Sequence, residues 1–246
     1  MNEINLMPLF ASNLIVNHLD SKFNTIDISN IKFRSTNNIG NSLGSSDSFF
    51  VVNDYPELGK EILKIFHQFT SQVLKINNQF TISTSWFTKM KPGDTCRFHQ
   101  HHNCFYSGLY YFDDYEDNSG NICFLNPLTR FNNFLIVPDK SDYNIHNSND
   151  WNIKPEKNMV LFFPSYLEHA ILDNTSKKSR HSLAFNIVDS AIDKTSSVQC
   201  VSTYTNLLDT STPKEARFST LVAFSVSIYT TIPPICWVDL ASCVAM

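Results

Sequence analysis

Short apolar segments separated by turn signals fill the chain from about residue 80 to residue 190, and they constrain the fold more than any other feature. The segments expected to be strands are 80–88, 104–112, 121–125, 159–163 and 183–188. Gly, Pro, Asn and Asp mark the turns between them. The last two segments are almost wholly apolar, as in strands buried on both faces. The pattern predicts a mainly β fold, either a sandwich or a barrel.

A helical part is expected before these strands. Asp54 or Tyr55 can cap a helix that has Pro56 in its first turn. Apolar residues then recur at helical spacing and should face the core: Leu58, Ile62, Ile65, Phe66, Phe69 and Val73. Periodicity becomes weak after about residue 189. We therefore expect one domain over residues 1–190, with its β core at about 80–190, and a C-terminal extension of unassigned role over 191–246.

Composition narrows the class of protein. Hydrophobic residues make up 42% of the 246 residues, which is enough for a sizeable core. A net charge of −4 without a long basic run does not favour a nucleic-acid partner. No segment has the roughly 20 consecutive apolar residues that a membrane span needs, and the N-terminus lacks the pattern of a secretory signal. Six cysteines without C-x-x-C spacing indicate reduced thiols. A cytoplasmic protein with no membrane partner is expected, and its oligomeric state is not predicted.

Three histidines stand in the pattern of a metal site. His99 and His101 are two residues apart, so they share one face if this segment is extended. His169 follows the apolar segment 159–163 and can close the site from a neighbouring strand. Imidazole suits iron, and three protein ligands leave coordination positions open. A single histidine is more often a surface or hydrogen-bonded residue, but the three together predict a metal centre. His102 points the other way and is not expected to be a ligand.

An arginine and a serine follow on the last strand. Arg180 and Ser182 share one face of a strand that is otherwise apolar on both sides. A buried guanidinium needs a partner charge or a ligand. Two interpretations are open: a structural ion pair with an Asp or Glu, or a bound carboxylate that the arginine grips through two parallel hydrogen bonds.

These motifs, in this order and spacing, resemble the 2-oxoglutarate- and Fe(II)-dependent oxygenases of marine bacteria and their phages. The resemblance runs from about Leu9 to Val188 and is tightest over 85–188. It is carried by Ser85-Trp86, Lys91-Pro92-Gly93, His99-x-His101, Phe105-Tyr106-Ser107-Gly108-Leu109-Tyr110-Tyr111, Phe163-Pro164-Ser165-x-x-x-His169 and Arg180-x-Ser182-x-Ala184-Phe185-Asn186.

The resemblance implies a double-stranded β-helix (jelly-roll) core with a catalytic Fe(II) held by His99, His101 and His169. It also implies that 2-oxoglutarate chelates the iron and that Arg180 holds its distal carboxylate. Ser182 would hydrogen-bond beside that carboxylate, and Tyr111 fits the place of a tyrosine that touches it. Tyr110 and Tyr111 can equally be simple core and surface aromatics.

One departure from the family pattern concerns the second ligand. Most oxygenases of this kind combine two histidines with a carboxylate, whereas His101 stands at the carboxylate position here. Either the centre works with three neutral imidazoles, or a carboxylate from elsewhere joins it. Asp94 and Asp113 are nearest in sequence, but neither has the right strand spacing.

The implied reaction is hydroxylation of an unidentified substrate, with release of succinate and CO2. The substrate can be a small molecule or a macromolecular side chain, and the reaction would take place in the cytoplasm (that of the host, if a phage encodes the protein). Trp86, Phe98, Tyr106 and Phe163 are candidates for the dry walls of the site. The irregular segment 126–150 is either a substrate lid or disordered.

Two alternatives remain open. A cupin-type metalloenzyme that does not use 2-oxoglutarate fits Gly93 ahead of His99-x-His101, but the glutamate expected four or five positions after His101 is absent and Phe105 and Tyr106 stand there. Arg180 would also have no role in such an enzyme. A non-enzymatic jelly-roll binding module is the second alternative, and the missing carboxylate favours it.

Overall fold

The computed structural model describes residues 10–35, 44–128 and 139–193. The expected C-terminal extension over 191–246 lies outside the described residues except for its first three positions. The proposed domain boundary near residue 190 therefore stays a prediction. The same holds for a lid over 126–150, because residues 129–138 are not described.

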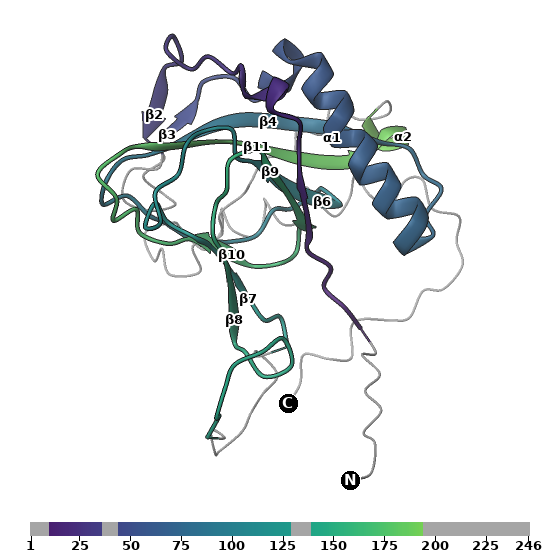
Figure 1. The fold of residues 1–246 in the computed structure, drawn as a ribbon. Helices are drawn as coiled ribbons and strands as arrows, with labels where there is room; N and C mark the ends of the chain where they lie inside the picture. The colour runs from purple at the N-terminus through teal and green to yellow at the C-terminus, as the bar shows by residue number, and fades with distance from the viewer. Residues whose placement is uncertain (1–9, 36–43, 129–138, 194–246) are drawn as a thin grey trace, which may run out of the picture. The chain divides into compact units, whose positions relative to one another are not determined.

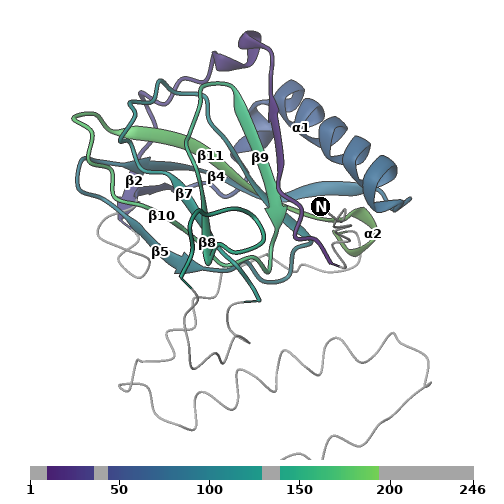
Figure 2. The same cartoon turned by 60° about the horizontal axis from the view of Figure 1, so that its bottom comes forward.

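Two antiparallel β-sheets pack against each other with an apolar core between them (Figures 1 and 2). The larger sheet consists, in spatial order, of β1 (Ile15–His18), β9 (Met159–Pro164), β6 (Tyr106–Tyr110), β11 (Arg180–Asp189), β4 (Phe80–Met90), β3 (Gly44–Ser46) and β2 (Phe33–Ser35). The smaller sheet consists of β5 (Cys96–His99), β10 (His169–Ile171), β7 (Ile122–Leu125) and β8 (Asp150–Ile153). This arrangement confirms the predicted jelly-roll class.

Helix α1 (Pro56–Phe69) covers the outer face of the larger sheet (Figure 1). Pro56 stands in its first turn, where the fixed φ of proline suits the helix and its missing N–H costs nothing. Leu58, Ile62 and Phe66 are buried against side chains of β4, β9 and β11. The predicted helix and most of its core-facing residues are thus confirmed.

The C-terminal end of the helix differs from the prediction that Val73 faces the core. Residues Thr70–Leu74 form a π-helical turn, η3, which changes the angular spacing of side chains, and Val73 is 60% exposed. The prediction that Val73 faces the core is therefore wrong. Lys75 then adopts a left-handed conformation, with φ of 57°, and stops the helix.

The other helical elements of the described residues are short. They are the 3₁₀ turns η1 (Ser21–Asn24) and η2 (Val51–Asp54) and the single turn α2 (Ser190–Asp193). The expected helical N-terminal part is therefore mostly α1, and the strands β1 to β3 extend the larger sheet at both edges instead. None of the described helices is long and apolar enough to cross a membrane. Three cysteines of the described residues, Cys96, Cys104 and Cys123, are free thiols.

The larger sheet separates two apolar cores. Leu183, Phe185 and Ile187 of β11 belong to the core under α1. Ala184 belongs to the core between the sheets, together with Met90, Leu109, Phe124 and other residues. Alternation along β11 thus directs one set of side chains to the helix and the other to the space between the sheets.

Gly108, in the centre of β6, allows the helix-side core to close. A Cβ at this position would lie 2.3 Å from Phe185 Cζ and 2.6 Å from the carbonyl oxygen of Leu161. Both contacts are far inside van der Waals distance, and the carbonyl cannot move aside without distorting β9. Phe185 therefore packs where any other residue at position 108 would place its side chain.

Replacing Gly108 by Ala should lower the free energy of unfolding by about 1–3 kcal/mol, the usual cost of overpacking a core. Chemical denaturation measures this change. Gly59→Ala in α1 is the matched control, because its new Cβ would meet only Val52 Cγ2, at 3.1 Å, and alanine favours the helix. Equal stability of Gly108→Ala and the wild type would contradict this account of the packing.

Candidate functional site

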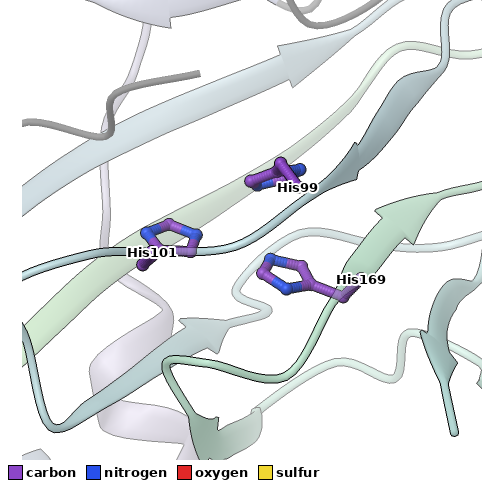
Figure 3. A group of neighbouring side chains, drawn as sticks. All are labelled: His99, His101 and His169. Atoms are coloured by element: carbon purple, nitrogen blue, oxygen red, sulfur yellow. The ribbon is translucent and has the colours of Figure 1, made fainter. Parts of the chain in front are cut away.

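The three predicted histidines lie together between the two sheets. His99 ends β5, His101 follows two residues later, and His169 begins β10. The antiparallel pairing of β5 and β10 places His99 directly opposite His169. One ring nitrogen from each residue lies within 4.8 Å of those of the other two, and the rings face a common space (Figure 3). In the part of the chain that the structure describes, no other group of this kind occurs.

Backbone carbonyls fix the tautomers of two of these rings. His99 Nδ1 lies 2.8 Å from the carbonyl oxygen of Arg97, and His169 Nδ1 lies 2.9 Å from that of Leu167. A carbonyl only accepts, so each Nδ1 must donate its hydrogen. Nε2 of both rings is then left with a free electron pair, which is the usual arrangement of metal-binding histidines.

His101 is held from both sides of the site. Its backbone N–H donates to the Ser165 carbonyl oxygen at 3.0 Å, and its ring stacks on that of His169 with an interplanar angle of 8°. The Nδ1 atom of His101 is buried and has no hydrogen-bond partner. A buried polar atom left unpaired is unfavourable, and a metal ion among the three rings would satisfy it.

The environment keeps all three imidazoles neutral. Burial lowers the pKa of His99 and that of His169, and the neighbouring histidine rings lower the pKa of His169 further. Burial, followed by repulsion from His99 and His102, lowers the pKa of His101 to about 3. Neutral imidazole is the form that binds a metal, so the free ligands do not have to lose protons near neutral pH.

No carboxylate joins the histidines within the described residues. Asp94 instead accepts a hydrogen bond from the backbone N–H of Lys91 at 2.7 Å, in the turn between β4 and β5. Asp113 pairs with His181 Nδ1 at 2.8 Å. The interpretation with three histidines thus fits the structure, and the two aspartates are committed to other contacts.

Arg180 is buried without an acidic partner. Its side chain is almost completely inaccessible, with a relative exposure of 2%. Its Nη1 donates to the carbonyl oxygen of Gly120 at 2.6 Å, and no Asp or Glu of the described residues forms an ion pair with it. A single neutral acceptor leaves most of the five guanidinium N–H donors unused. The structural ion pair considered from the sequence is therefore not formed with any described residue.

Two tyrosines surround the guanidinium. Its Cζ lies 5.4 Å from the ring centre of Tyr111 and 5.9 Å from that of Tyr115. The Tyr111 hydroxyl is buried next to the guanidinium, and no other group of the described residues hydrogen-bonds to it. Burial raises the pKa of Tyr111 against the opposing effect of the Arg180 charge, so the hydroxyl remains a donor. A guanidinium without an acidic partner in the described residues and a phenolic hydroxyl beside it form a ready site for a carboxylate.

Gly120 makes the Arg180 contact geometrically feasible. It adopts φ of +88°, which favours glycine, and a Cβ there would lie 2.4 Å from the carbonyl oxygen of Leu172. In the sequence, this glycine is only part of the turn signal Asn118-Ser119-Gly120. Its function of presenting a carbonyl to the buried arginine depends on contacts that sequence spacing does not contain.

Ser182 and Asn186 occupy the same face of β11 as Arg180. Ser182 Oγ lies 2.7 Å from Thr88 Oγ1 on the neighbouring strand β4. Asn186 donates to Thr84 Oγ1 at 3.0 Å and accepts from Ser107 Oγ at 2.8 Å. The two residues therefore belong to cross-strand polar contacts on the floor of the site.

The four aromatic residues proposed as dry walls fall into two groups. Trp86 stacks on His101 with ring centres 6.0 Å apart, and Phe163 lies 4.5 Å from the ring of His169. Tyr106 instead packs against Phe66 of α1, in the other core. Phe98 is 42% exposed and alternates with His99 along β5, so it lies on the opposite face.

Comparison with known families identifies the central part of the chain. A family model described as "Putative 2OG-Fe(II) oxygenase" matches residues 84–186, which contain the three histidines, Tyr111 and Arg180. This part of the chain therefore resembles a 2OG-Fe(II) oxygenase domain. The resemblance inferred from the motifs is thus confirmed, and 2-oxoglutarate and iron are the cofactors of its family.

Similarity to solved structures concerns the fold. HygX from Streptomyces hygroscopicus, with nickel, 2-oxoglutarate and hygromycin B bound, has a TM-score of 0.51 at 10% identity, over 73% of this chain and 84% of its own. A Pseudomonas putida prolyl-4-hydroxylase has a TM-score of 0.46 at 13% identity, over 71% and 92%. The viral collagen prolyl hydroxylase of Paramecium Bursaria Chlorella virus-1 also has a TM-score of 0.46, at 14% identity, over 71% and 94%. No curated protein matches the sequence of this oxygenase.

The three histidines should bind one divalent ion per chain. Replacing His169 or His101 by Ala should weaken Mn(II) or Ni(II) binding by more than about 100-fold, since even outer contacts of metal ligands contribute 10- to 100-fold. Isothermal titration calorimetry measures the affinity. His102→Ala is the matched control, because His102 is an exposed neighbour outside the group. Wild-type affinity in His169→Ala would contradict the assignment.

Proposed function

We propose that this oxygenase is a 2-oxoglutarate- and Fe(II)-dependent dioxygenase in which His99, His101 and His169 hold the iron, and Arg180 and Tyr111 bind 2-oxoglutarate. With both bound, dioxygen would be consumed, a C–H bond of the substrate hydroxylated, and 2-oxoglutarate converted to succinate and CO2. We further propose that Ser182 borders the 2-oxoglutarate site. The protein itself would bind and orient the reactants and keep water out of the site.

The buried guanidinium of Arg180, which has no acidic partner among the described residues, is the observation that carries this proposal. An isolated buried charge is strongly unfavourable, and Gly120 alone does not neutralise it. Arg180 and Ala184 lie on the same face of β11. Their Cα atoms are about 13 Å apart, at about 3.3 Å per residue along the strand. Ala184 pairs with Trp86, whose ring stacks on His101. The guanidinium and the histidines therefore border the same space between the sheets. A short dicarboxylate bound to the ion through one end would extend toward the guanidinium.

Charge balance supports the same pair of ligands. Three neutral imidazoles leave the two positive charges of the ion uncompensated, and Arg180 adds a third. The dianion of 2-oxoglutarate would compensate two of these charges at the two places where they occur. A small monoanion would reach the metal or the arginine, but not both.

The two alternatives now have unequal support. A cupin-type enzyme without 2-oxoglutarate would leave Arg180 and the Tyr111 hydroxyl without a ligand. A non-enzymatic binding module remains compatible with the histidine geometry, and loss of turnover would have to be shown by experiment. The substrate, a small molecule or a macromolecular side chain, stays unidentified. The cytoplasmic location expected from the sequence stays a prediction.

Arg180→Ala should weaken 2-oxoglutarate binding by about 2–5 kcal/mol, the usual cost of losing one partner of a buried charged contact. The measurement is an anaerobic titration of the Fe(II)-loaded protein with 2-oxoglutarate, followed by the visible absorption band of the iron-bound keto acid. The band should appear in the wild type and vanish in His169→Ala.

Arg97→Ala is the matched control for this titration, because the Arg97 side chain is exposed on β5 and only its backbone touches His99. It should bind 2-oxoglutarate as the wild type does. Bound iron without a band in the wild type would favour the cupin-type alternative. Unchanged affinity in Arg180→Ala would remove this residue from the site.

Tyr111→Phe separates a binding role from a structural one. The substitution removes a buried hydroxyl without a partner, so the free energy of unfolding of the ligand-free protein should not fall and can rise by about 1–3 kcal/mol. Affinity for 2-oxoglutarate should fall by about 10-fold, the value of one hydrogen bond to a charged group.

Tyr110→Phe is the control, because its hydroxyl donates to Asn24 Oδ1 at 3.1 Å on the helix side of the sheet. It should lose about 1 kcal/mol of stability and keep 2-oxoglutarate affinity. Denaturant titration and the absorption titration give the two readouts. Loss of stability without loss of affinity in Tyr111→Phe would make Tyr111 a core residue only.

A further inference from the structure

Phe49 is an exposed aromatic side chain that the structure fixes beside the metal site. Its ring centre lies 6.1 Å from that of Trp86, and the Trp86 ring stacks in turn on His101 at 6.0 Å. Phe49 is 51% exposed and Trp86 is partly exposed. Three rings, Phe49, Trp86 and His101, thus lead from solvent to one of the proposed metal ligands. We call these rings the aromatic step.

The position of Phe49 is set by hydrogen bonds to β4. The Phe49 carbonyl accepts from the Ser85 N–H at 2.7 Å, and Ser85 Oγ accepts from the Val52 N–H at 2.9 Å. Ser46 Oγ accepts from the Phe87 N–H at 3.1 Å. The segment that carries Phe49 is therefore attached to the strand of Trp86 on both sides of the ring contact.

An exposed apolar side chain that borders a site offers apolar surface that a ligand can bury. The two ring contacts of the aromatic step join uncharged rings, and the nearby Asp47 is paired with Arg34. The Trp86 and His101 planes are inclined by only 25°. A flat, uncharged ring suits such a surface, because aromatic rings pair by stacking and edge contacts.

We propose that the aromatic step is the substrate subsite of this oxygenase and that it takes a flat, uncharged aromatic ring, with Phe49 as a specificity-determining residue. This inference rests on the proposed function, because it assumes that chemistry takes place at the ion between the histidines. Phe49 lies outside residues 84–186, so the matched oxygenase domain does not contain it. The subsite would therefore combine Trp86 and His101 of the matched residues with Phe49, which precedes them.

The first test is direct binding of p-cresol, without metal. A Trp151→Phe/Trp237→Phe variant keeps Trp86 as its one tryptophan, and its fluorescence should change saturably with p-cresol. Phe49→Ala in this background should weaken p-cresol binding by about 3- to 10-fold, the value of one aromatic pair. Phe50→Ala is the matched control: Phe50 is 48% exposed but has no ring contact with Trp86 within the described residues, and its affinity should stay unchanged.

Three results would overturn the proposal. They are no saturable change, equal affinity in Phe49→Ala, and equal affinity of the wild type for 4-methylcyclohexanol, which matches p-cresol in size but is not flat. Dimerisation that both Phe49→Ala and Phe50→Ala abolish, measured by sedimentation, would make this surface a contact between copies and would also overturn it.

The second test places the probe relative to the ion. In protein loaded with Mn(II) and 2-oxoglutarate, the proton relaxation of p-cresol should increase, and this increase should fall in Phe49→Ala but not in Phe50→Ala. Binding of Mn(II) and 2-oxoglutarate without any relaxation effect would overturn the subsite and leave the proposed function intact. Failure of Mn(II) to bind would contradict the proposed function, while the fluorescence test would still decide whether a ring binds.

Discussion

The alternation of side chains along β11 is the constraint on which the rest of the structure depends. Arg180, Ser182 and Asn186 face the space between the sheets, whereas Leu183, Phe185 and Ile187 belong to the core under α1. Pairing with β4 on one side and β6 on the other fixes this register. A shift by one residue would place a guanidinium in the helix-side core and apolar rings at the site. Packing under α1 thus stabilises the position of every polar group on the opposite face.

The site combines positive charge with neutral ligands. Burial disfavours protonated imidazole, so the three histidines stay neutral. Arg180 cannot do the same, because a guanidinium does not lose its proton in proteins. Its charge remains in the core, where the faces of two tyrosine rings and one carbonyl stabilise it in part. The ligand-free site is therefore cationic at one end and ready for a metal at the other.

Most residues of the candidate site could be predicted from the sequence. His99 and His101 are close in the chain, and the apolar segment before His169 predicts a strand, so both signals are local. The alternation of Arg180 and Ser182 is also a local pattern. Val73 was misplaced because a π-helical turn changes the helical spacing without a sequence signal that we recognise. Gly120 and Phe49 were missed because their roles depend on contacts with Arg180 and Trp86, which are distant in sequence.

The location of α1 determines how long a fragment of the chain must be in order to fold. The recognisable oxygenase sequence covers residues 84–186, but α1, β1 and β3 lie before it. α1 covers the apolar outer face of the larger sheet, and β1 pairs with the edge of β9. A fragment cut to the recognisable sequence would expose a row of buried phenylalanines and an unpaired strand, the features that promote aggregation. The segment that the family model matches and the segment that folds are different units in this protein, and the first is contained in the second.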